Sequence, residues 1–156
     1  MQVIIETPKG SRNKYAWDQD QQIFELKKVL PEGMAFPHDF GFIPSTEADD
    51  GDPIDVLVLM DQPVFTGCLV KARLVGVIEG QQTEKGKSER NDRLLAVAES
   101  SHTHSNINSL SDLNKDLLKE LEQFPVNYHL NDGAEFKVLA RKGPDAAATC
   151  LKKAKT

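Results

Sequence analysis

The sequence lacks several features that would assign it to a familiar class of proteins. It has no apolar run near the roughly 20 residues that a membrane-spanning helix needs. It opens on strand-like residues, with no basic and then apolar leader segment. It has no excess of basic residues, because 19 Lys and Arg against 24 Asp and Glu give a net charge of −5. We therefore expect a cytoplasmic protein that binds neither membranes nor nucleic acid.

Cysteine is also scarce. The two cysteines, Cys68 and Cys150, lie far apart and show no metal-finger spacing. Free thiols in a reducing compartment are the favoured interpretation, with a single disulfide as the open alternative. His102 and His104 lie in a Ser- and Asn-rich stretch without the spacing of a zinc site. The sequence therefore gives no reason to expect zinc.

The patterning of apolar residues predicts one α+β domain over residues 1–156. A chain of this length can bury about 70% of its unfolded surface. Short strands separated by Gly and Pro come first, and helices come late, which favours a small barrel with C-terminal helices. The expected strands are 2–5, 15–17, 23–28, 56–60, 68–78, 94–98 and 135–140, with an ordered loop or short irregular strand within 30–43. Residues 80–92 are expected to form a flexible polar excursion. A helix capped by Ser109 or Ser111 and a short helix from Pro144 complete the prediction.

Three carboxylates crowd into one turn just before the apolar run 56–60. Asp50, Asp52 and Asp55 surround Gly51, which permits a left-handed backbone, and Pro53, which fixes φ near roughly −65°. Carboxylates forced together repel unless a cation lies among them, and hard oxygen ligands suit Mg²⁺, Mn²⁺ or Ca²⁺. A solvated acidic turn is the plain alternative. A calcium-sensor loop is excluded, because a strand rather than a helix follows and the glycine stands in the wrong place.

Other polar residues are placed where they could serve a bound polyanion. Lys14, Lys28 and Arg93 lie where strands begin or end, and direct cations are needed beside metals to pair all the oxygens of a phosphate. Glu6 alternates with apolar residues on the first strand and so could face a site. Tyr128 and His129 end the long helix, where a phenol and an imidazole could reach a ligand, although core packing is the more common role for such a tyrosine.

These residues together resemble the soluble, family I inorganic pyrophosphatases. The run Asp50-Gly51-Asp52-Pro53-Ile54-Asp55-Val56-Leu57-Val58 resembles that family's signature. The segments 3–8, 14–15, 36–43 and 93–97 resemble further family segments, and Tyr128 stands where the family keeps a tyrosine.

The resemblance implies a five-stranded OB-like β-barrel with flanking C-terminal helices, and Mg²⁺-dependent splitting of pyrophosphate into two phosphates, with Mn²⁺ as the alternative metal. It implies metal ligation by Asp50 and Asp55, proton acceptance by Asp52, and support of the outer metals by Glu6. Binding of phosphate oxygens is implied for Lys14, Lys28, Arg93 and Tyr128, with His129 in place of a lysine. It also implies a homo-oligomer, either a hexamer or a trimer.

The second acidic loop departs from the family pattern. Asn91 stands where a metal-bridging aspartate is expected, so Glu84 and Asp92 are the candidate ligands there. Ala16 stands for a glutamate, and Phe36 and Phe40 stand for tyrosines. Two further readings therefore stay open: a hydrolase of another phosphoanhydride, such as a nucleotide or short polyphosphate, and a non-catalytic barrel that binds phosphates or nucleic acid.

Overall fold

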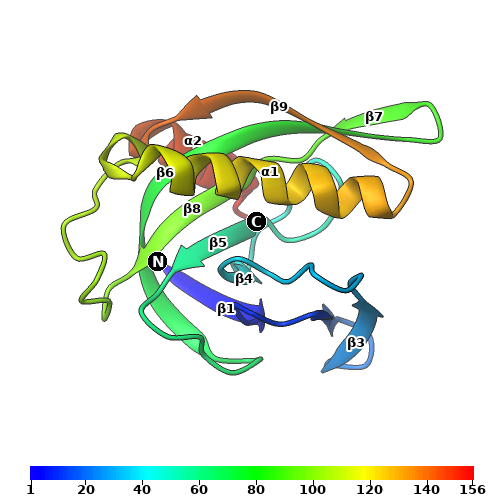
Figure 1. Cartoon of the computed structure of the whole chain (residues 1–156), viewed down its shortest axis with the longest axis horizontal. Helices are drawn as coiled ribbons and strands as arrows, with labels where there is room; N and C mark the ends of the chain where they lie inside the picture. The colour runs from blue at the N-terminus through cyan, green and yellow to red at the C-terminus, as the bar shows by residue number, and fades with distance from the viewer.

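Five strands pair into a closed ring at the centre of the molecule. A computed structural model describes all 156 residues. Strand β1 (Gln2–Thr7) pairs with β4 (Asp39–Phe42) on one side and with β6 (Leu69–Glu84) on the other. β5 (Asp55–Leu59) and β8 (Arg93–Ala98) complete the ring, with β5 and β8 as its parallel pair. The predicted α+β architecture with a five-stranded barrel is confirmed (Figure 1).

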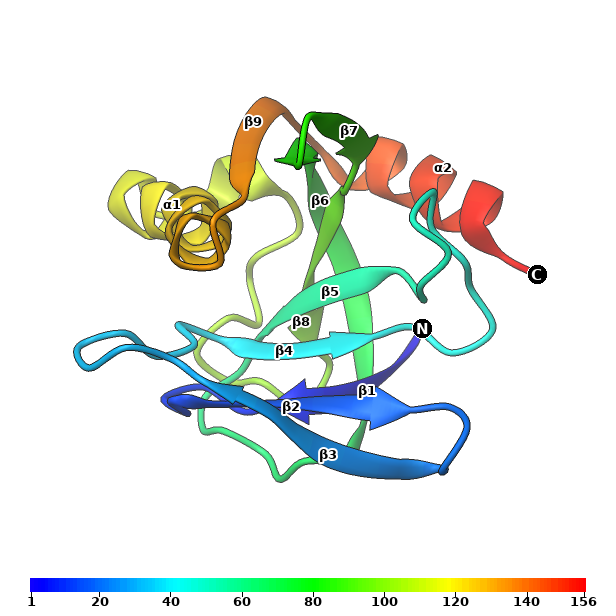
Figure 2. The same cartoon turned by 90° about the vertical axis from the view of Figure 1, so that its right-hand side faces the viewer.

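One hairpin, the strand β9 and two helices surround this ring (Figure 2). β2 (Asn13–Asp18) and β3 (Ile23–Val29) form a separate two-stranded sheet below β1, and β9 (Glu135–Lys142) pairs with β6. The helices α1 (Lys115–Asn131) and α2 (Pro144–Ala154) lie on opposite sides of β6 and β9. None of the helices is long and apolar enough to cross a membrane.

The apolar run in β5 is continuous because both of its faces are buried. Val56 and Val58 belong to a core cluster that includes residues of α2, whereas Leu57 and Leu59 belong to a second cluster that includes residues of α1. Alternate side chains of a strand point to opposite faces, so one strand joins the two cores. The acidic turn that precedes β5 is therefore attached to the most buried part of the molecule.

Two expectations about local structure were wrong. Residues 80–92 do not form a flexible excursion, because β6 runs on to Glu84 and turns back into β7 (Lys87–Arg90) as a regular hairpin. The cap of the long helix is Asn114, whose side chain accepts hydrogen bonds from the amides of Asp116 and Leu117. Ser109 instead caps the 3₁₀ turn Leu110–Asp112.

The remaining expectations are close to what is found. The segment 30–43 is largely irregular and ends in the short buried strand β4. Pro144 begins α2, as its fixed φ and missing amide hydrogen predict. Cys68 and Cys150 are free thiols.

Candidate active site

The acidic turn is held in shape by its own backbone. Gly51 adopts φ +86°, and its amide donates to the carbonyl of Ala48 at 2.9 Å. The Ala48 amide donates to the Asp52 carbonyl at 2.7 Å, and the Asp52 amide donates to the Asp50 carboxylate at 3.1 Å. These bonds keep the carboxylates of one short segment close together.

Thr46 attaches the turn to the barrel. Its buried hydroxyl donates to the Ile43 carbonyl at 2.6 Å and accepts from the Ile54 amide at 3.0 Å. The Ile43 amide donates to the Ile54 carbonyl at 3.1 Å, so the two ends of the loop are joined just before β5 begins. Asp55, the first residue of β5, is thereby fixed relative to Asp50 and Asp52.

The carboxylates of this turn disfavour one another's charge. Burial raises the pKa of Asp52, and the nearby carboxylates of Asp50 and Asp55 raise it further. Burial likewise raises the pKa of Asp55, against the lowering effect of the Arg93 and Lys14 cations. Such a cluster favours whatever brings positive charge to it.

Arg93 supplies one of those positive charges. Its side chain is only 7% exposed, and its Nη1 donates to the Asp55 Oδ2 at 2.9 Å. The guanidinium carbon lies 5.7 Å from the ring centre of Phe40 and 5.3 Å from that of Phe136. The parallel pairing of β5 and β8 explains the contact, because it aligns Val56 with Leu94 and so brings their preceding residues together.

Glu6 and Lys14 meet at the edge where β1 packs against β2. The buried Glu6 carboxylate accepts a 2.7 Å hydrogen bond from the Trp17 amide. Burial raises the pKa of Glu6, with Lys14 opposing that rise and Asp55 and Asp52 adding to it. Burial lowers the pKa of Lys14, whose Nζ lies 4.1 Å from the ring centre of Phe40. The charges of β1 and β2 therefore share one site with the acidic turn.

Aromatic rings form the other wall of this site. A small cavity is lined by Lys14 and Arg93 and by five apolar or aromatic residues: Phe36, Phe40, Leu57, Phe124 and Tyr128. Lys28 lies over the ring of Tyr128, 3.9 Å from its centre, and also forms an ion pair with Asp132. Asp132 was not foreseen, because 104 residues separate it from Lys28 and no local pattern connects them.

His129 lies behind this wall rather than in it. Its imidazole is buried, stacks on Phe136 with ring centres 5.1 Å apart, and has its Nδ1 2.7 Å from the Pro125 carbonyl. Burial, with a smaller contribution from Arg93, lowers the pKa of His129 to about 4. His129, which the resemblance places at the substrate, is turned toward β9 by helical periodicity and is not among the residues that line the aromatic cavity.

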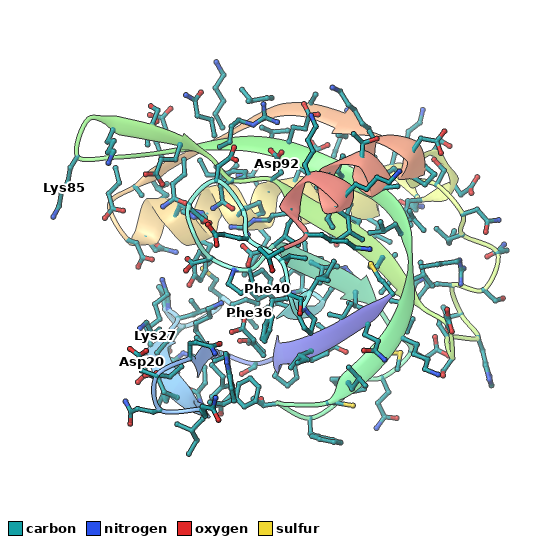
Figure 3. The ribbon with its side chains drawn as sticks, turned by 180° about the vertical axis from the view of Figure 1, so that it is seen from behind. Asp20, Lys27, Phe36, Phe40, Lys85 and Asp92 are labelled. Carbon is teal, nitrogen blue, oxygen red and sulfur yellow. The ribbon has the colours of Figure 1, made fainter.

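The two candidate ligands of the second loop lie apart from each other, Asp92 beside α2 (Figure 3) and Glu84 at the end of β6. Asp92 faces α2, and its carboxylate accepts from the Gly80 amide at 3.0 Å and from Arg90 at 3.0 Å. Glu84 is exposed at the end of β6, next to the hairpin tip at Lys85. Asp92 thus lines a cavity with Ala48 and Asp49, whereas the side chain of the next residue, Arg93, contacts Asp55.

Four carboxylates remain that share one site: Glu6, Asp50, Asp52 and Asp55. As the side chains stand, no three His, Cys, Asp or Glu groups are gathered closely enough to hold a metal ion. Asp50 nevertheless raises the pKa of Asp52 and Asp55, and the carboxylates of Asp52 and Asp55 raise the pKa of Glu6. The oxygen atoms of all four are of the type that Mg²⁺ prefers. The arrangement is a cluster of four acids next to Lys14 and Arg93, and these two cations also line the aromatic cavity.

Comparison with known proteins agrees with this geometry. The family model described as inorganic pyrophosphatase matches residues 3–156. The chain belongs to the inorganic pyrophosphatase family. Among relatives, the inorganic pyrophosphatase of Synechocystis sp. is 39% identical over 92% of this chain and 83% of its own length. That of Methanosarcina acetivorans is 37% identical over 99% of this chain and 89% of its own length.

Solved structures give the same answer for the fold. The inorganic pyrophosphatase from Thermus thermophilus superposes with a TM-score of 0.90 at 32% identity, covering 99% of this chain and 88% of its own. The one from Helicobacter pylori has a TM-score of 0.90 at 33% identity, covering 99% and 90%. The members of this family are enzymes, and the chain is accordingly an inorganic diphosphatase.

Proposed function

We propose that this pyrophosphatase family member hydrolyses inorganic pyrophosphate to two phosphates, with Mg²⁺ as the resident cofactor and Mn²⁺ as a substitute. The observation that supports this most directly is that four clustered carboxylates lie next to the cations Lys14 and Arg93, which line one cavity. Four carboxylates alone would repel a polyanion. The two cations Lys14 and Arg93 alone would not balance the negative charge of the four carboxylates. Both are accounted for if the pocket binds divalent metal and pyrophosphate together.

The residues present fit a divalent metal. The acidic turn offers the oxygens of Asp50 and Asp55 on a rigid backbone, and Glu6 approaches from β1. When bound, divalent ions lower the pKa of coordinated water and neutralise charge on attacking and leaving oxygens. Asp50 and Asp55 would be the principal ligands, with Glu6 supporting from the far side. Glu84 and Asp92 have no part in this assignment.

The side chains of the pocket have separable roles toward substrate. Asp52 accepts a proton from the attacking water, and its raised pKa makes the carboxylate a better base than a free aspartate. Lys14 and Arg93 bind phosphate oxygens from the aromatic side. Lys28 and the Tyr128 hydroxyl bind the outer phosphate, once Lys28 exchanges its partner Asp132 for the substrate.

Substitution of Asp52 tests the proposal. Asp52→Asn keeps the size of the side chain and removes the base, so we expect phosphate release at millimolar Mg²⁺ to fall by at least about 10²-fold. Asp49→Asn is the matched control, because Asp49 lines a different cavity beside α2. Unchanged turnover in Asp52→Asn, or no turnover in the unmodified protein, would refute the assignment.

The same assay addresses the substrate. The segment 80–92, whose expected flexibility motivated a longer phosphoanhydride as substrate, is a regular hairpin, and this favours pyrophosphate. We expect turnover of pyrophosphate to exceed that of tripolyphosphate and nucleoside triphosphates.

We further propose a homo-oligomer, a hexamer or trimer, in the cytoplasm. Sedimentation of the purified chain tests the oligomer.

A further inference from the structure

Lys28 reaches the end of α1, where two side chains hold its ammonium group. Its Nζ lies 3.9 Å from the ring centre of Tyr128 and forms an ion pair with the carboxylate of Asp132. Tyr128 and Asp132 are four residues apart at the end of α1 and therefore lie on the same face of the helix. Tyr128 also lines the cavity that contains Lys14 and Arg93. The Asp132 carboxylate is thus bound to a cation at the border of the proposed substrate site.

The helix itself gives no reason for a carboxylate at this position. Asp132 is the C-terminal cap of α1, and its backbone amide donates to the carbonyl of His129 at 3.0 Å. The C-terminal end of a helix carries partial negative charge, so a carboxylate there is unfavourable. The ion pair with Lys28 offsets this effect. The role of the Asp132 charge is therefore to be found in Lys28 rather than in the helix.

Two lysines face each other across the hairpin of β2 and β3. Lys14 and Lys28 are register partners in this antiparallel pair, so their side chains leave the same face of the two strands. Like charges directly opposite each other are destabilising. In the free protein, Asp132 gives Lys28 an anionic partner and so reduces this repulsion. Pyrophosphate has enough oxygen atoms to bind both lysines at once, and it then replaces Asp132 as the partner of Lys28.

The ion pair is exposed enough to exchange its partners. The side chains of Lys28 and Asp132 are 28% and 48% exposed, whereas that of Arg93 in its pair with Asp55 is 7% exposed. Solvent weakens a pair that is exposed to this degree, and such pairs contribute little to stability. A phosphate group that reaches Lys28 therefore has only a weak contact to displace.

We propose that Asp132 lowers the affinity of this site for phosphate groups, because its carboxylate competes for Lys28 with the substrate and with the product phosphate. This rests on the function proposed above and names a residue that sets the substrate affinity of the same site. Asp132 does not touch the reacting atoms and acts through Lys28, so it is a positioning residue. Its carboxylate leaves Lys28 when pyrophosphate binds and returns when phosphate dissociates.

Steady-state kinetics with a charge-removing variant tests the inference. Asp132→Asn keeps the size of the side chain and the backbone cap of α1. We expect the KM for pyrophosphate and the inhibition constant of phosphate each to fall about two- to fivefold, the range for a partly exposed ion pair. Glu135→Gln is the matched control, because it removes one negative charge three residues further on, at an exposed position of β9. We expect it to leave both constants unchanged. In a Lys28→Gln background, Asp132→Asn should have no further effect.

The outcomes separate this inference from the function on which it rests. An unchanged or higher KM in Asp132→Asn would overturn the inference, since a carboxylate that orients Lys28 toward the substrate would raise KM when its charge is lost. An equal fall in Glu135→Gln, or an equal fall in the Lys28→Gln background, would also overturn it. The pyrophosphatase assignment would stand in each case, and it fails only if the unmodified protein releases no phosphate. Titration calorimetry with inorganic phosphate then decides the inference without turnover: tighter binding to Asp132→Asn supports it, and equal or absent binding overturns it.

Discussion

His129 differs from the sequence expectation in a way that has a measurable consequence. It stands next to Tyr128, which lines the pocket, yet its imidazole is buried against Phe136 and contacts a helix carbonyl. Burial favours the neutral ring and lowers its pKa to about 4 from an ordinary value near 6.5. At pH values between about 4 and 6.5, the His129 imidazole is therefore protonated in the unfolded chain and neutral in the folded chain.

We expect the stability contributed by His129 to be complete above pH 6.5 and to be lost as the pH falls toward 4. The variant His129→Leu removes this loss, so its free energy of unfolding relative to the unmodified protein should improve by about 3 kcal/mol between pH 7 and pH 4. Urea denaturation at a series of pH values measures the difference. Parallel profiles for the two proteins would show that the imidazole titrates normally in the fold.

Local patterns in the sequence found the acidic turn but not the partners that come from distant segments. Gly51, Pro53 and the acids around them are contiguous, so their rigidity and mutual repulsion could be predicted. The ion pair of Lys28 joins two residues that are 104 positions apart in the sequence. The orientation of Asp92 depends on its hydrogen bond with the Gly80 amide, at the other end of the hairpin. A lone Asn91 suggested a weakened metal site, but only the structure pairs it with Gln82.

The pairing of β1 with β4 depends on one residue without a side chain. A Cβ on Gly41 would lie 2.1 Å from the carbonyl oxygen of Ile4, which is backbone and cannot move aside as a side chain would. Ile5 and Gly41 are register partners in this antiparallel pair. Close contact of the two strands, which places Thr7 opposite Phe40, therefore requires glycine at this position.

Gly41→Ala is expected to lower the free energy of unfolding by at least about 2 kcal/mol, because the added methyl group forces the strands apart. Gly143→Ala is the matched control, since its Cβ would lie 3.7 Å from the nearest atom and its φ of −78° suits any residue. We expect the control to change stability by well under 1 kcal/mol. Equal effects from the two substitutions in urea denaturation would contradict the proposed crowding.

Hydrophobic patterning predicted most of the strands because their periodicity is local. The hairpin 80–92 was missed because its outer strand is polar and exposed on both faces, so backbone pairing rather than burial defines it. A barrel was expected from the many short strands and from the family resemblance, but no local pattern shows that β1 pairs with β6, more than 60 residues away. Local patterns therefore predicted the positions of strands and helices more reliably than which strands pair with each other.

When no cation is bound, burial and mutual repulsion of the clustered carboxylates lower the stability of the whole folded chain. The raised pKa values of Glu6, Asp52 and Asp55 mean that the fold favours their protonated forms. Their contribution to stability is therefore present at low pH and is lost as the pH rises through the raised pKa values. A bound dication reverses this, because it interacts with the ionised carboxylates only.

We expect Mg²⁺ or Mn²⁺ to stabilise the folded chain most strongly above the raised carboxylate pKa values and progressively less as the pH falls through them. At 100 times the Kd of the metal, the gain should be about 2.7 kcal/mol, which corresponds to a rise in Tm of about 5 to 10 °C. Scanning calorimetry with and without metal at several pH values measures it. In the variant Asp50→Asn with Asp55→Asn, the metal-free protein loses the Asp55–Arg93 ion pair together with the repulsion, so the comparison is made within the variant, where the metal-dependent rise should disappear. A Tm that rises equally with metal in this variant would place the cation elsewhere on the molecule.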